Sequence, residues 1–181
     1  MAQGQFQSVV NFVNAPGTPG DLAAEAPLVS QSVIVDSDGV TPNTIGFGAS
    51  YITNVIPFGE GQNTVQTGNP TGTAVFAGIM ANSKEQASFG GKSGPLSPTL
   101  DLADKSQVSV VSEGHMWVYM NTPSNIGDVV VYNNVTGELS CYPPSAVLPI
   151  GSSNAYATVY QFSNSAPGLC RIWLNPGVTG L

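Results

Sequence analysis

The chain has 181 residues and a mass of 18.6 kDa, which suits one domain of ordinary size or a modest domain with an extended arm. Only 8% of its residues are charged, where a typical soluble protein carries about 25%, so most of the exterior must be uncharged polar side chains, Gly and backbone. With a net charge of -7 and no cation before Lys84, the chain lacks the basic surface that binding to nucleic acid requires. We therefore expect no nucleic-acid partner.

No apolar run approaches the roughly 20 residues of a membrane helix. Residues 1–8 contain neither the basic nor the apolar region of a signal peptide, so we expect synthesis in a cytoplasm and no membrane contact. Cys141 and Cys170 belong to no CxxC pair and indicate no zinc site. Two buried thiols are the expected state, with a disulfide between them as the alternative.

The first 27 residues are predicted to form an extended N-terminal arm. Residues 5–13 resemble a strand, residues 14–21 break it with two prolines and two glycines, and a short helical turn at 22–26 ends before Pro27. Such an arm can add a strand to the sheet edge of a partner protein. Its side-chain anchors would be Phe6, Val9, Val10, Phe12 and Val13. Residues 28–181 are predicted to form a single β-rich domain.

The middle of the chain is rich in turn signals. Residues 59–72 and 90–98 are interpreted as long connections that run over the surface. Asp36 and Asp38 before Gly39 imitate the start of a calcium loop, but the later oxygen ligands and the terminal Glu are missing. A tight turn at Asp38–Gly39 is the simpler interpretation, so no metal site is expected.

The second half of the chain contains closely spaced strand signals. Strands are predicted at 108–111, 115–120 and 128–133, with turns at Glu113–Gly114 and Thr122–Pro123 and a hairpin turn from Asn133 to Gly137. Residues 154–162 alternate with period two, and residues 168–174 form a strand with both faces covered. The fold class is therefore all-β, as a jelly-roll-like β-sandwich or barrel with an extended N-terminal arm and long loops.

No residue pattern indicates catalysis. His115 is the only histidine, and no Ser lies in a GxSxG elbow. Residues 90–94 contain GKS, but a phosphate loop requires Gly at position 86, which is Gln. We expect no enzymatic activity, no catalytic residue and no cofactor.

Aromatic side chains on alternating strand positions are the remaining candidate site. Alternating aromatics typically belong to a core or a subunit interface, and a platform that binds carbohydrate is the alternative. The candidates are Trp117, Tyr119, Tyr156, Tyr160 and Trp173.

Four stretches resemble the cement, or decoration, proteins of tailed-bacteriophage heads. Residues 6–23 are similar to the family's N-terminal arm, and residues 76–88 to its Gly-containing strand with a polar continuation. Residues 112–139 resemble its paired Val-rich strands with a TG hairpin, and residues 169–177 its final strand. Residues 90–107 and 141–162 depart from this pattern.

The resemblance implies a role rather than a set of contacts, because the family has no known catalytic residues. It implies a virion protein on the outer face of the capsid that binds the major capsid protein and bridges neighbouring subunits. It also implies self-association, with a homodimer favoured over a trimer. The alternative function is a receptor-binding or carbohydrate-binding β-module of a phage fibre or tail.

Overall fold

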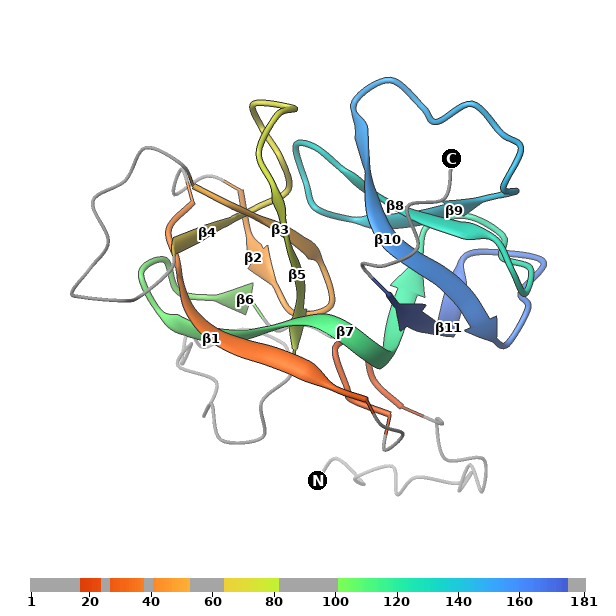
Figure 1. Ribbon diagram of the computed structural model, residues 1–181, viewed down its shortest axis with the longest axis horizontal. Helices are drawn as coiled ribbons and strands as arrows, with labels where there is room; N and C mark the ends of the chain where they lie inside the picture. The colour runs from red at the N-terminus through yellow and green to blue at the C-terminus, as the bar shows by residue number, and fades with distance from the viewer. Residues whose placement is uncertain (1–16, 24–26, 38–40, 53–63, 82–100, 176–181) are drawn as a thin grey trace, which may run out of the picture.

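The computed structural model describes residues 17–23, 27–37, 41–52, 64–81 and 101–175. These residues contain eleven strands (Figure 1). None of these residues is helical, so no helix within these ranges is long and apolar enough to cross a membrane. The all-β prediction is confirmed. The strands are β1 (Val29–Val35), β2 (Asn43–Thr44), β3 (Gly48–Tyr51), β4 (Thr64–Thr67), β5 (Phe76–Ala81), β6 (Asp101–Leu102), β7 (Gln107–Met120), β8 (Val129–Asn133), β9 (Leu139–Tyr142), β10 (Ser152–Gln161) and β11 (Gly168–Leu174).

The first lobe is a small closed barrel. Its strands pair in the order β1–β4–β3–β5–β7, and β7 pairs in turn with β1, which closes the ring. The β1–β4 pair is parallel and the others are antiparallel. The interior is filled by small and β-branched side chains, as a narrow barrel requires. They are Val33, Val35, Ala49, Val65, Ala77, Val108 and Val110, and the longer side chain of Met80 completes the core.

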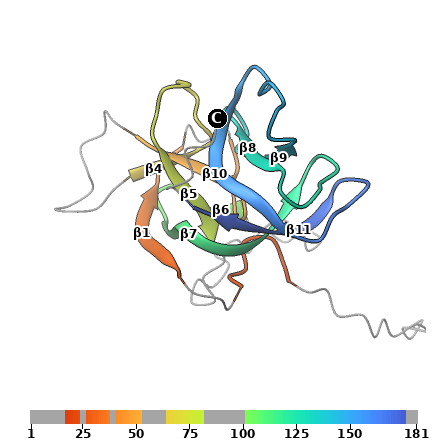
Figure 2. The same ribbon diagram turned by 45° about the vertical axis from the view of Figure 1, so that its right-hand side comes forward.

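The second lobe is a curled antiparallel sheet in the order β7–β11–β10–β8–β9 (Figure 2). Its last strand returns to the end of β7, where the Asn121 amide donates to the Leu139 carbonyl at 2.9 Å. The concave side of the sheet encloses a second core that includes Met116, Val130 and Ile172.

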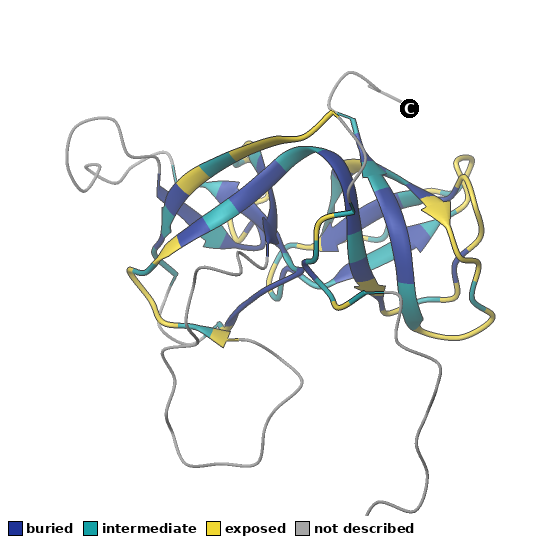
Figure 3. Ribbon diagram, turned by 90° about the horizontal axis from the view of Figure 1, so that it is seen from below, coloured by how far each residue is buried: buried dark blue, intermediate teal, exposed yellow. Residues whose placement is uncertain are grey.

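Strand β7 belongs to both lobes, as Figure 1 shows. Val108 and Val110 point into the barrel, whereas Val111 and Met116 belong to the second core. Strand β5 is likewise buried on both faces along most of its length, and Figure 3 shows the buried strands meeting between the lobes. Strands enclosed on both faces become continuously apolar, which accounts for the composition of β5.

The contact between the lobes is close because glycine lines it. The Gly48 amide donates to the Gly137 carbonyl at 2.8 Å, and the Asn69 amide donates to the Asn134 carbonyl at 2.8 Å. A Cβ on Gly68 would lie 2.5 Å from the Asn134 oxygen. The β8–β9 hairpin therefore packs directly against the barrel backbone.

Several predicted elements are corrected by the structure. Residues 108–120 lie in one strand, because Gly114 takes a φ of +130° within β7 instead of making a turn. The predicted loop 59–72 contains β4, which is held by β1 and β3. Leu22 and Ala23 pair with β7 and are not helical. The strand order of the described residues does not confirm a jelly roll.

Other predictions are confirmed. The turn after β8 runs from Asn133 to Gly137, with the Gly137 amide donating to the Asn133 carbonyl at 2.9 Å. Cys141 and Cys170 are buried, free thiols. The predicted strand at 5–13, the connection 90–98 and the turn at Asp38–Gly39 lie outside the described residues.

Candidate interaction surface

Residues 17–23, here called the arm root, lie along the edge of β7 opposite β11. Leu22 forms an antiparallel bridge with Met116. The Gly20 amide donates to the Trp117 carbonyl at 2.7 Å, and the Trp117 amide donates to the Asp21 carbonyl at 2.9 Å. The Ala23 amide donates to the His115 carbonyl at 3.0 Å. The arm root therefore acts as a short extra strand of the curled sheet.

Gly17 fixes the place at which the chain reaches the body. A Cβ at this position would lie 2.5 Å from Cγ of Trp117, so only glycine allows the backbone to lie against the indole ring. Trp117 is half-buried as a result.

The outer surface of β7, β11 and β10 carries a continuous group of rings, here called the aromatic face. His115 and Trp173 are cross-strand neighbours, with ring centroids 6.1 Å apart and planes 17° apart. The ring centroid of Tyr160 lies 4.6 Å from that of His115, and the ring centroid of Phe162 lies 5.1 Å from that of Trp117. The aromatic face consists of His115, Trp117, Tyr119, Tyr160, Phe162, Arg171 and Trp173.

Exposure and charge indicate what this surface can contact. Tyr119, Tyr160 and Phe162 are 47%, 42% and 49% exposed, which is high for large apolar side chains. Arg171 is buried among them, with its guanidinium 5.5 Å from the Tyr160 ring centroid and Nη1 donating to Oε1 of Gln161 at 3.1 Å. A cation held under the rings leaves an outer layer that is aromatic and uncharged, the composition typical of the centre of a protein interface.

Four of the five predicted aromatic residues meet on this surface: Trp117, Tyr119, Tyr160 and Trp173. Tyr156 does not, because a register shift in β10 directs it to a cleft between the lobes. Sequence reasoning missed His115, Phe162 and Arg171 as members of the site, although Phe162 alternates with Tyr160 and His115 with Trp117. The predicted arm anchors Phe6, Val9, Val10, Phe12 and Val13 lie outside the described residues.

The buried thiols are unreactive at neutral pH. Burial, with a smaller contribution from the neighbouring Cys141, raises the pKa of the Cys170 thiol to about 12. Burial also raises the pKa of Cys141, against a hydrogen bond from Thr122. Thiols of this kind are protonated in the native state and are weak nucleophiles. Within the described ranges, no three His, Cys, Asp or Glu side chains gather as metal ligands.

The described residues define an all-β protein whose curled sheet carries the arm root and the aromatic face. The family model for "Structural cement protein (E217 gp24/Pam3 gp6)" matches residues 6–175. The chain therefore belongs to the structural cement protein family of bacteriophages. Its role is that of a cement protein, and its place is the capsid of the virion.

A solved structure supports the same fold. A chain in the structure titled "The capsid of Myoviridae Phage XM1" aligns with a TM-score of 0.63 over 96% of this chain and 99% of that one. The two sequences are 10% identical, so the likeness concerns the fold alone. Comparison with curated proteins gives no match.

Proposed function

We propose that this cement protein binds the outer surface of the major capsid protein shell and bridges neighbouring capsid subunits, without an enzymatic role. The observation that carries the proposal is the position of the arm root beside the aromatic face. Gly17 lies against Trp117, so the arm root reaches the aromatic face at this residue. A body that contacts one subunit with its face can reach the next subunit with its arm.

The chemistry of the surface favours this use. Desolvation of charged side chains opposes association, whereas Tyr119, Tyr160 and Phe162 supply apolar area with few rotatable bonds. Ordering an arm of this length costs about 1–2 kcal/mol per residue. The arm must therefore gain main-chain hydrogen bonds on its partner, as an added strand does.

The arm is tested by removing residues 2–16, a cut that leaves the arm root on β7. The truncated and full-length proteins are added to shells assembled without cement protein, and bound copies are counted by quantitative mass spectrometry. We expect a folded body with occupancy reduced at least tenfold, which corresponds to about 1.4 kcal/mol of binding free energy. Unchanged occupancy would remove the arm from the mechanism.

The aromatic face is tested by the double variant Tyr119→Ser, Phe162→Ser. The matched control is Ile150→Ser, because Ile150 is fully exposed on the β9–β10 connection, away from the face. Large rings at the centre of an interface contribute about 2 kcal/mol or more each, so occupancy should fall in the double variant and persist in the control. Equal occupancy of both would exclude the face as a capsid contact.

Bridging and self-association require a direct view of the particle. A cryo-electron microscopy map is expected to show each copy in contact with two capsid subunits on the outer surface. We propose a homodimer, with a trimer as the alternative, and native mass spectrometry of the isolated protein distinguishes these states from a monomer. Copies that each touch a single capsid subunit would contradict bridging.

A further inference from the structure

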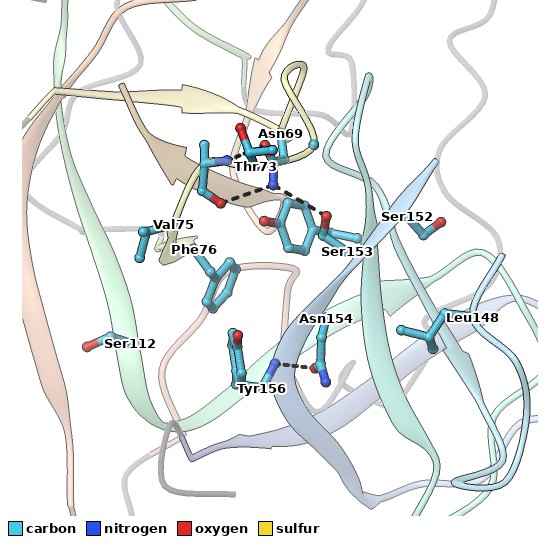
Figure 4. A pocket seen from close by; sticks show the side chains of 13 residues that line it. Asn69, Thr73, Val75, Phe76, Ser112, Leu148, Ser152, Ser153, Asn154 and Tyr156 are labelled. Carbon is cyan, nitrogen blue, oxygen red and sulfur yellow. Dashed lines mark hydrogen bonds between the residues drawn. The ribbon is translucent and has the colours of Figure 1, made fainter. Parts of the chain in front are cut away.

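A cleft of about 570 Å³ lies between the two lobes (Figure 4). Its first wall is the β4–β5 connection with Asn69, Thr73 and Val75, and its second wall is the start of β10. Phe76 lies between the walls, and Tyr132 also lines the cleft. None of the lining residues is charged. This volume lies within the roughly 300–1,000 Å³ of typical small-ligand sites.

The polar groups of the cleft are held in place by one another. The Asn69 side chain donates to the Ala74 carbonyl and accepts from the Ala74 amide, both at 3.1 Å. Oγ of Ser153 donates to Oδ1 of Asn134 at 2.7 Å. The Tyr132 hydroxyl bonds to both Asn69 and Ser153, and burial raises its pKa, so it stays protonated. The walls are therefore ordered before any ligand arrives.

Tyr156 is directed into this cleft by an unfavourable backbone conformation. The register of β10 shifts between Asn154 and Ala157, and Tyr156 takes a φ of +50°, a region that bulky residues rarely occupy. Its amide is held by Oδ1 of Asn154 at 2.7 Å, and its carbonyl accepts from the Asn175 amide at 2.9 Å.

Core packing does not explain this conformation. The Tyr156 ring is 38% exposed, 6.1 Å from the Phe76 ring, and contributes to neither core. Left-handed backbone at such a residue costs about 1–3 kcal/mol and is concentrated at functional sites. The strain keeps an aromatic ring available to a ligand.

We propose that this cleft binds a neutral carbohydrate. The tilted rings of Phe76 and Tyr156 offer apolar faces for the C–H groups of a sugar, and the surrounding amides and hydroxyls match its hydroxyl groups. Nδ2 of Asn154 has no hydrogen-bond partner among the described residues. An uncharged lining favours neutral sugars over acidic ones, because a carboxylate or phosphate would lose its hydration without gaining a cation.

The test uses the isolated full-length protein, neutral oligosaccharide arrays and saturation-transfer NMR. The decisive variant is Tyr156→Gly, because glycine accepts a φ of +50° without strain and removes the ring. We expect this variant to be at least as stable as the wild type and to bind the sugar at least about tenfold more weakly. The control Tyr119→Ala removes a similarly exposed ring from the aromatic face and should bind the sugar normally.

Two results would overturn the proposal: no neutral sugar bound by the wild type, or equal binding by the wild type and Tyr156→Gly. Capsid occupancy of Tyr156→Gly separates this site from the cement role. Normal occupancy with lost sugar binding supports the carbohydrate site, whereas lost occupancy with no sugar binding by the wild type would assign the cleft to a capsid segment instead.

Discussion

Adding one methyl group at Gly68 should destabilise the junction between the lobes far more than the same change at Gly72. The two residues have nearly equal φ angles, +72° and +70°. They differ in surroundings: a Cβ on Gly68 would lie 2.5 Å from the Asn134 oxygen, whereas a Cβ on Gly72 meets only Nδ2 of Asn134, at 3.9 Å. The comparison of Gly68→Ala with Gly72→Ala therefore separates the clash from the backbone strain.

The magnitudes follow from these contacts. Left-handed backbone costs Ala about 1–2 kcal/mol, offset by about 0.4–1 kcal/mol of reduced unfolded-state entropy, so Gly72→Ala should lose about 1 kcal/mol. At Gly68 the methyl also meets a carbonyl that accepts the Asn69 amide at 2.8 Å and cannot move freely. Overpacking against fixed atoms adds about 1–3 kcal/mol, for a total of about 2–4 kcal/mol.

Urea unfolding followed by tryptophan fluorescence measures both losses, with equal slopes expected for the wild type and the two variants. For a chain of this size, each kcal/mol lowers Tm by about 2–4 °C. Gly72→Ala should therefore melt a few degrees below the wild type and Gly68→Ala about 5–15 °C below it. Equal shifts in the two variants would show that the hairpin moves aside at little cost, and would refute the close junction.

Two further predictions concern the thiols and the arm root. The folded-state pKa of Cys170, about 12, lies above the value of 9.0 for a free thiol, so the native state holds its proton more tightly. The protonated Cys170 thiol therefore contributes its full share to the free energy of unfolding below pH 9, and this contribution falls as the pH rises from 9 toward 12, by no more than about 1.4 kcal/mol per pH unit. Cys170→Ala should reduce the fall of the urea midpoint over this pH range. An unchanged dependence of the midpoint on pH would contradict the assignment. Gly17→Ala should separate the arm root from Trp117, so hydrogen exchange at the Gly20 and Ala23 amides should become faster while the amides of β10 stay protected. Unchanged exchange at the Gly20 and Ala23 amides would refute the contact.

Local patterns predicted the strands best where pairing is local. The β8–β9 hairpin has Asn133 and Gly137 at its turn, and the alternation of Cys170, Ile172 and Leu174 matches the buried side of β11. Strand β4 was missed because four residues between turn signals carry little local information, and its partners β1 and β3 are remote or weakly patterned. Gly114 was interpreted as a turn, although in β7 it allows the close approach of the Pro27 carbonyl.

The aromatic face was partly predictable for the same reason. Trp117 and Tyr119 alternate along one strand, and Trp173 follows the same period on its neighbour. Alternation alone also assigned Tyr156 to this side, and the register shift in β10 overturned that assignment. The cleft could not be predicted, because it joins residues as far apart in sequence as Asn69 and Ser153.

The course of the chain beside β7 determines how the protein carries mechanical load. The arm root and β1 both run antiparallel to β7, from Trp117 down to Gln107. A pull on the arm along this axis loads their backbone hydrogen bonds together in shear, so they resist as a group instead of peeling one at a time. Because β7 belongs to both cores, tension on an arm held by the shell, as proposed above, would be transmitted to both lobes of the body.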